Sequence, residues 1–387
     1  MKARMRLHRV LPFAVSLVAA LAAPVAASAA PTITEFAAGN GPTSVARGAD
    51  GNVWFADNPK PAAVGQVTPS GSVTTYAAPT ADAGPLGITS GPGGLWFTEN
   101  AKNKIARSTT NGLISEFPLG SHDKPVGITA GPDGNLWYTA TGKGGAIGRM
   151  TPTGTVTEFT LGLTTNGSPQ DITAGPDGNL WFAAPATGRI GRITPQGAIR
   201  EYAVPTLFGT PQSITAGPDG SLWFTEQGLS PAIGRITTAG VITEYRAGLP
   251  PASEPLAITA GADGNIYFTD TGVNAIGQVT PSGAITMFGA GITAGADLRD
   301  ITTGSDGRLW FAEAATGKLG RMTVAPTATA GGATAVTATT ATVNGSITPN
   351  SQSTTYRFEW GTTPSYGQTS ATVSAGSGAA AQAVGAG

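Results

Sequence analysis

Short runs of apolar residues alternate with glycine-rich turns along most of this chain, and the pattern repeats about every 42 residues. The clearest copies read ITAGPDGNLWFAA from Ile172 and ITAGPDGSLWFTE from Ile214, and a degenerate copy reads ITTGSDGRLWFAE from Ile301. One aromatic residue marks each copy, at spacings of 42, 41, 44, 42, 44 and 43: Trp54, Trp96, Trp137, Trp181, Trp223, Tyr267 and Trp310. Seven copies at one period indicate a repeat architecture.

Each repeat is predicted to contain four short strands. The ITAG run is the first strand, and the Asp-Gly that follows it, as at Asp177, supplies the positive-φ glycine of a tight hairpin turn. The LWF run is the second strand, the IGRIT run at Ile190 is the third, and a Thr-Pro-x-Gly turn leads to the fourth, such as TVTEF at Thr155. Beyond residue 29 no stretch shows sustained helical spacing of apolar residues. Four-stranded antiparallel units of this length are typical of β-propeller blades.

The two ends of the repeat region complement each other. The seventh repeat stops at Thr323 without a fourth strand, whereas an extra strand, TITEF, precedes the first repeat at Thr32–Phe36. An open solenoid would need polar capping repeats at both ends. Pairing of the extra strand with the third strand of the last repeat would instead leave no exposed edge. The sequence therefore predicts an all-β, seven-bladed propeller whose ring is closed by its N-terminal strand.

Residues 1–29 have the features of a secretory signal peptide. Four basic side chains within the first nine residues precede an apolar run over residues 10–23, and Ala27-Ser28-Ala29 gives a small-x-small cleavage pattern. The apolar run is too short to span a bilayer, and no run of about 18 apolar residues follows it, so no transmembrane segment is expected. We expect a mature chain from Ala30 that is secreted, either extracellular or associated with the cell envelope. An uncleaved anchor is the alternative.

Residues 30–324 are predicted to form the propeller, and the composition changes after them. Residues 325–387 are rich in Ala, Thr, Gly and Ser, with an aromatic cluster around Tyr356 and Trp360. The phrase TATVNGSITPNSQSTTYRFEWGTTPSYG resembles the first half of a fibronectin type III-like β-sandwich. A complete sandwich of this kind needs about 100 residues. We therefore expect a partial sandwich with a low-complexity tail, either truncated or partly ordered.

Charge and cysteine content exclude several classes of function. Without the first 29 residues, 18 Lys and Arg face 23 Asp and Glu, a net charge of −5, and no basic stripe is present to displace phosphate counterions. Nucleic acid is therefore not an expected partner. The absence of cysteine excludes disulfides, zinc-thiolate sites and a cysteine nucleophile. We expect a monomer held together by its core and its topology.

The repeated phrases ITAGPDGSLWFTE and IGRIT resemble the streptogramin B lyases, also called virginiamycin B lyases, over all seven repeats. The resemblance implies a magnesium-dependent elimination that opens a cyclic depsipeptide at its ester, on the propeller face where each first strand begins. It also implies two histidines in the last two blades, with a glutamate two residues before the second. Such an elimination needs a base for the α-proton, an acid for the leaving alkoxide and a cation for the enolate-like charge.

This chain departs from the family pattern at those positions. Leu256 and Arg299 stand where the two histidines belong, and Asp297 takes the place of the glutamate. Leucine has no exchangeable proton, and arginine stays protonated at any working pH. We therefore predict no catalytic residue at this site, and we expect magnesium as a cofactor only if the family site were functional.

Candidate binding residues are polar side chains expected at the mouth of the central channel. Asp297, Arg299 and Asp300 form either a polar binding point or a charge network that joins adjacent blades. His122 is either an isolated general base or a solvated loop residue. The candidates are His122, Asp123, Lys124, Gln170, Gln212, Glu254, Asp297, Arg299 and Asp300.

The leading interpretation is a secreted, non-catalytic recognition module that binds a small molecule, a peptide or a glycan. Its specificity would lie in the loops that join the outer strand of one blade to the inner strand of the next, since these loops vary while the strands repeat. One alternative is a carbon–oxygen lyase, or another metal-assisted enzyme, with a relocated site. A purely structural surface module is a third. Acids after the aromatic strands and arginines in the third strands predict only partial ion pairing within blades, because Ala140 and Ala184 replace two of the acids.

Overall fold

The computed structural model describes residues 18–20, 31–58, 61–120, 124–335, 337, 340–361 and 368–386. The chain divides into two compact units. One spans Pro31–Val324, and the other contains Ala325–Gly387 together with the N-terminal residues to Ala30.

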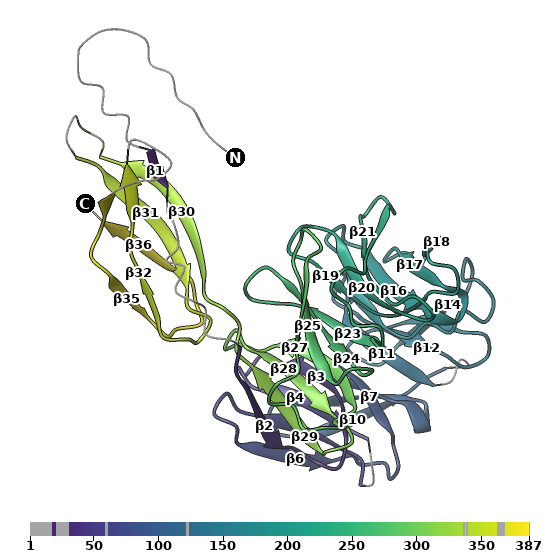
Figure 1. Ribbon diagram of the computed structural model, residues 1–387. Helices are drawn as coiled ribbons and strands as arrows, with labels where there is room; N and C mark the ends of the chain where they lie inside the picture. Colours follow the sequence, from purple (N-terminus) through teal and green to yellow (C-terminus); the bar gives the residue numbers. More distant parts are fainter. Residues whose placement is uncertain are drawn as a thin grey trace. The chain divides into compact units, whose positions relative to one another are not determined.

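The larger unit consists of seven four-stranded antiparallel sheets, the blades of a propeller (Figure 1). In blades one to six the strands follow the order of the sequence from the inner to the outer edge. Blades one to three are formed by β3 (Pro42–Arg47), β4 (Val53–Asp57), β5 (Ala63–Val67) and β6 (Val73–Ala77); by β7 (Pro85–Gly91), β8 (Gly94–Glu99), β9 (Lys104–Ser108) and β10 (Ile114–Pro118); and by β11 (Pro125–Ala130), β12 (Leu136–Ala140), β13 (Ala146–Met150) and β14 (Val156–Phe159).

Blades four to six repeat the same plan, and two short 3-10 helices, η1 (Asn100–Lys102) and η2 (Pro185–Thr187), lie in hairpins of blades two and four. These blades are formed by β15 (Ile172–Ala174), β16 (Leu180–Ala184), β17 (Arg189–Ile193) and β18 (Ile199–Ala203); by β19 (Thr210–Ala216), β20 (Leu222–Gln227), β21 (Ala232–Ile236) and β22 (Ile242–Tyr245); and by β23 (Pro255–Ala260), β24 (Ile266–Asp270), β25 (Ala275–Val279) and β26 (Ile285–Phe288).

The seventh blade is built from both ends of the propeller unit. It contains β27 (Leu298–Thr303), β28 (Leu309–Glu313) and β29 (Lys318–Met322), and its outer strand is β2 (Ile33–Ala37). β2 pairs antiparallel with β29, with Phe36 opposite Leu319, and the Phe36 ring stacks on Trp310 at a centroid distance of 5.5 Å. The inner strands β27 and β3 also lie side by side. The predicted seven-bladed ring, closed by the N-terminal strand, is confirmed.

The core lies between the blades. The second strand of each blade is buried over nearly its whole length. Successive side chains of this strand point to opposite faces of the blade, and both faces are covered by neighbouring blades. In β20, Leu222 and Phe224 pack with Trp181 of the preceding blade, and Trp223 packs with Phe268 of the following one. This arrangement explains why the second strands read as continuous apolar runs.

The glycine of the IGR phrase is required by packing. A Cβ on Gly234 would overlap the ring of Phe224, which lies flat against the third strand of the same blade. The same glycine-over-ring contact recurs in five other blades, and blade two carries Ala106 instead, opposite Phe97. The equivalent glycines are Gly65, Gly148, Gly191, Gly277 and Gly320.

The aspartate of each Asp-Gly turn has a role beyond the turn itself. Asp219 accepts the indole N–H of Trp223 at 3.1 Å, and its other oxygen lies 2.6 Å from Nε of Arg235. Asp177 likewise accepts the indole N–H of Trp181 at 3.0 Å and forms a longer ion pair with Arg192 at 3.9 Å. Third-strand arginines therefore pair with the turn acid in blades four and five, and in several blades the arginine lies over the marker tryptophan.

The second unit is a set of small antiparallel sheets. Phe358 and Ile347 are buried in it, and Tyr356 meets Phe358 edge-on at 5.8 Å. The prediction that this segment is a partial fibronectin type III-like sandwich stays a prediction. Its sheets are β30 (Thr327–Thr334), β31 (Thr342–Thr348) and β36 (Gln382–Ala386); β32 (Thr354–Tyr356) and β35 (Val373–Gly376); and β1 (Val18–Ala20), β33 (Glu359–Gly361) and β34 (Gln368–Thr369).

The predicted signal peptide lies outside the described residues, apart from the three residues of β1. Over the part of the chain that the structure describes, no helix has the length and apolar character needed to cross a membrane.

Candidate functional site

The inner strand of most blades loses register with its neighbour where the central channel opens. In blade five the pairing of β19 with β20 shifts between Pro211 and Ile214, and β3, β7, β11, β23 and β27 show the equivalent shift. A β-bulge of this kind changes the direction in which its side chains point. The residues within these bulges line the mouth of the channel.

Hydroxyl groups of the second strands hold the bulges in place. Thr225 accepts the N–H of Ser213 in its own blade at 3.1 Å and donates to the carbonyl of Leu256 in the next blade at 2.6 Å. Thr98, Thr139 and Thr269 make the same pair of contacts. The backbone of the mouth residues is thus fixed both by the second strand of its own blade and by that of the preceding blade.

Blades one, four and seven have alanine at the threonine position, and in blades four and seven an aspartate makes the inter-blade contact instead. Asp171 accepts the hydroxyl of Ser213 at 2.6 Å and the N–H of Ile214 at 2.9 Å, both from blade five. Asp300 repeats this arrangement toward blade one, with the Ser44 hydroxyl at 2.5 Å. Each carboxylate also accepts a backbone N–H of its own strand. Of the two alternatives for Asp300, these bonds support a role in joining adjacent blades.

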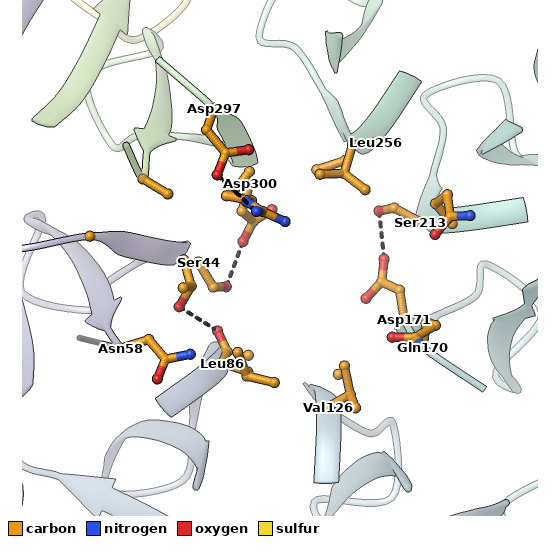
Figure 2. Close-up of a pocket in the computed structure, with 18 of the residues that line it drawn as sticks. Ser44, Asn58, Leu86, Val126, Gln170, Asp171, Ser213, Leu256, Asp297 and Asp300 are labelled. Carbon is orange, nitrogen blue, oxygen red and sulfur yellow. Dashed lines mark hydrogen bonds and ion pairs between the residues drawn. The ribbon is translucent and has the colours of Figure 1, made fainter. Parts of the chain in front are cut away.

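The bulges surround a cavity of about 710 Å³ at the channel mouth, lined by residues from all seven blades (Figure 2). Leu86, Val126 and Leu256 project toward its open centre, and Asp171 and Asp300 lie on opposite sides. From blade one to blade seven, the equivalent mouth positions are Thr43, Leu86, Val126, Gln170, Gln212, Leu256 and Arg299.

The mouth combines apolar and polar surface. Gln170 and Gln212 place two side-chain amides on neighbouring blades, and the Gln212 amide also donates to the carbonyl of Thr210 at 3.2 Å. Across the cavity, Arg299 forms an ion pair with Asp297 at 2.8 Å, and both side chains are partly exposed. Cavities with mostly apolar walls and a few polar groups of fixed position are typical of small-molecule and peptide sites.

The two inter-blade aspartates titrate at higher pH than ordinary aspartates. Burial raises the pKa of Asp300 to about 6; the bonds from Ser44 and Val45 oppose this shift, and the negative charge of Asp171 adds to it. Burial likewise raises the pKa of Asp171, against the bonds from blade five. The negative charge of Asp300 at the base of the mouth therefore changes within the mildly acidic range.

The structure brings most of the predicted binding residues together. Gln170, Gln212, Asp297, Arg299 and Asp300 all line the cavity. Leu256, the residue at the first family histidine position, lines it as well.

The other four candidates lie away from the cavity or outside the described residues. Glu254 is exposed and is not among the residues lining the cavity; its N–H donates to Asp270. Lys124 lies beside Asn100 and Lys102 in a separate surface hollow. His122 and Asp123 lie outside the described residues.

The sequence did not single out Asp171, or its partner Ser213, as residues of the mouth. The available signal was the residue just before the first-strand isoleucine, which reads Ser, Gly, Gly, Asp, Ser, Ala and Asp through the seven blades. At the same position of the next blade around the ring, each of the two aspartates is followed by a serine: Asp171 by Ser213, and Asp300 by Ser44. The pairing becomes apparent only when blade seven is placed beside blade one.

The carboxylates of the mouth do not fit a magnesium site. Within the ranges that the structure describes, no three or more His, Cys, Asp or Glu side chains are grouped so that they could hold a metal ion. Asp297 is paired with a guanidinium, and Asp171 and Asp300 are occupied by bonds to neighbouring blades. A hard cation needs several oxygen ligands converging on one point.

Comparison with protein families gives a match over most of the chain. The model of the Virginiamycin B lyase family matches residues 27–124 and 120–363. A virginiamycin B lyase of Nocardia farcinica is 32% identical over 166 residues, which is 43% of this chain and 56% of that protein. The chain thus matches little more than half the length of this curated relative.

Solved structures give a more extensive match. A selenomethionine-substituted virginiamycin B lyase from Staphylococcus aureus aligns with a TM-score of 0.70 and 37% identity, over 76% of this chain and 99% of that one. A catalytically inactive histidine-to-alanine variant of the Staphylococcus aureus enzyme, solved with quinupristin, aligns with the same TM-score, identity and coverage.

Proposed function

This chain belongs to the virginiamycin B lyase family, and we propose that it is a recognition propeller that keeps the family scaffold without the elimination chemistry. Its ligand would sit in the mouth cavity, with apolar groups against Leu86, Val126 and Leu256 and polar groups on Gln170 and Gln212. The relative solved with quinupristin makes a cyclic peptide-like ligand the first class to test.

One observation carries the proposal. Leu256 and Arg299, the residues at the family's histidine positions, both line the cavity, and neither can take a proton from a substrate. General acid and base groups typically contribute about 10²- to 10⁴-fold each to a rate. With neither group present, elimination at this mouth would be too slow to serve as a function.

We also propose that the protein is secreted, on the basis of the signal-peptide pattern in residues 1–29. The second candidate function is a lyase with a relocated site. The observation that favours it is His122, the one histidine after the signal segment, four residues before Val126 of the mouth.

Quinupristin with magnesium tests binding and chemistry together. We expect the melting temperature to rise with quinupristin concentration, since a ligand that binds only the folded state stabilises it. We expect the ring to stay intact over hours in chromatography coupled to mass spectrometry. Elimination would give a new peak of unchanged mass, whereas hydrolysis would add one water. A new peak of unchanged mass would overturn the proposal, and no rise in melting temperature would exclude this ligand class.

Two variants locate the ligand-binding site and any ring-opening activity. Gln170→Ala combined with Gln212→Ala should abolish the stabilisation by quinupristin and leave the melting temperature of the free protein nearly unchanged. If ring opening were observed, His122→Ala would decide between the relocated site and the mouth.

A further inference from the structure

Three blades carry a fully buried glutamate at or next to the end of their second strand. Glu99 in blade two, Glu226 in blade five and Glu313 in blade seven have 0% exposure. Both carboxyl oxygens of Glu99 and Glu226, and one oxygen of Glu313, have no hydrogen-bond partner. A buried carboxylate without a donor is costly, so these three groups need a physical explanation.

Each buried glutamate faces a second glutamate on the outer strand of its own blade. In blade two this is Glu116, which binds the ammonium of Lys104 at 2.6 Å and the N–H of Thr80 at 2.8 Å. Blade five repeats the arrangement with Glu244, Arg246 and Thr206, and blade seven repeats it with Glu35, Lys318 and Thr293. The outer carboxylate is thus satisfied, and the buried one lies beside it without a cation of its own.

Protonation of the buried glutamate explains how the two carboxyl groups of a pair can lie side by side. If both carboxyl groups of a pair were ionised, two negative charges would meet with no donor between them. A proton on the buried glutamate turns the contact into a charge-assisted O–H···O⁻ bond to the outer carboxylate. The charged groups that act on Glu99 are Glu116 and Lys104; those on Glu226 are Glu244 and Arg246; those on Glu313 are Glu35 and Lys318.

Other blades show that the pairing is specific. Blades one and six end the strand in Asp57 and Asp270, whose carboxylates accept loop N–H groups, at 2.7 Å from Gly41 and 2.8 Å from Glu254. Their outer strands carry Thr75 and Met287 at the position of the second glutamate. Among the blades that the structure describes, a buried glutamate therefore occurs only where the outer strand also carries a glutamate.

The three pairs lie directly behind the mouth. In the strand register, Glu99 is opposite Pro85, Glu226 opposite Pro211 and Glu313 opposite Leu298. The residues that follow these partners line the cavity: Leu86, Gln212 and Arg299. The threonine bound by each outer glutamate lies in the loop that leads to the same mouth residue.

We infer that the three glutamate pairs are proton-operated clamps. The two glutamates of each pair share one proton, and the loss of this proton as the pH rises loosens the adjoining loop at the mouth. The three loops are residues 77–85, 203–211 and 289–298. The shifts of the individual groups agree with this. Burial, strengthened by the neighbouring glutamate, raises the pKa of Glu99, Glu226 and Glu313 to about 7. Hydrogen bonds from the cation and the threonine keep the pKa of Glu116, Glu244 and Glu35 below its usual value.

Hydrogen exchange on the whole protein tests the clamps without any ligand. Protection factors, which correct for the intrinsic pH dependence of exchange, are compared between about pH 5.5 and about pH 8.5. Protection in the three clamped loops is expected to fall on the order of tenfold to a hundredfold, because an opened loop would release its glutamate to a normal pKa. The loops of blades one and six, residues 37–42 and 247–255, should change little and serve as internal controls.

Glu99→Gln provides the matched variant. Its side-chain amide can donate to Glu116 at any pH, so protection of residues 77–85 should become independent of pH, while residues 203–211 and 289–298 keep the wild-type response. Equal pH responses in clamped and control loops of the wild type would overturn the inference. So would a Glu99→Gln protein that retains the wild-type response in residues 77–85. If that variant failed to fold, the comparison among wild-type loops would decide alone.

Discussion

Ser44 of blade one donates its hydroxyl to the carboxylate of Asp300 in blade seven at 2.5 Å, across a sequence separation of 256 residues. The N–H of Val45 reaches the same carboxylate oxygen at 2.9 Å. The ring is therefore joined twice between its first and last repeats. The outer joint is the pairing of β2 with β29, and the inner joint is this bond at the channel mouth.

Ser44→Ala should destabilise the protein by about 1–3 kcal/mol, since it removes a hydrogen bond to a buried charged group. The loss should be larger at pH 8 than at pH 5. The pKa of Asp300 is raised to about 6, so the carboxylate is ionised only above that pH, and the Ser44 bond favours the ionised form. Urea unfolding at the two pH values measures the difference. An equal loss at both would contradict the assignment, and Ser213→Ala is the matched variant at Asp171.

Phe36→Ala should weaken the outer joint of the ring. The Phe36 side chain stacks on Trp310 and packs against the buried cluster between blades seven and one. We expect a loss of about 2–4 kcal/mol in the free energy of unfolding, as for other large-to-small changes in a core. Thr34→Ala, on the exposed side of the same strand, should be nearly neutral. Deletion of residues 32–36 should cost more than either substitution; a change of only a few degrees in melting temperature would contradict the role of β2.

Gly234→Ala should destabilise blade five by about 1–3 kcal/mol, because the new methyl group would overlap the ring of Phe224 and force it to shift. Blade two already carries Ala106 at this position, so the change is expected to be tolerated at a cost rather than to prevent folding. Ala106→Gly is the reciprocal variant. Thermal unfolding of both proteins measures the effect. An unchanged melting temperature for Gly234→Ala would show that the aromatic ring of Phe224 is not fixed by this contact.

Truncation after Val324 should leave a stable propeller. All seven blades lie within Pro31–Val324, and Val324 itself is buried in the cluster around Leu298 and Phe311. We expect the shortened protein to melt within a few degrees of the full chain. A truncation after Arg321, which removes the buried Met322 and Val324, should melt much lower. Similar behaviour of the two truncations would contradict the boundary.

The sequence by itself determined the number of blades, the four strands of each and the closing strand. These features follow from signals within a few residues: the Asp-Gly turns, the apolar second strands and the glycine of the IGR phrase. It also placed Leu256 and Arg299 at one site, because a repeat gives equivalent residues equivalent positions. The role of the turn aspartates was not predicted, since it depends on how the following tryptophan side chain is oriented.

Only the tertiary structure decided which polar groups meet. Asp171 with Ser213, Asp300 with Ser44, and Glu313 with Glu35 are separated by tens to hundreds of residues, and each pair forms because blades or closing strands are brought side by side. Hydrogen bonds and proton sharing depend on the last ångström of such an approach and on the exclusion of water. A repeat period fixes which residues are equivalent, but it does not specify those distances or that burial.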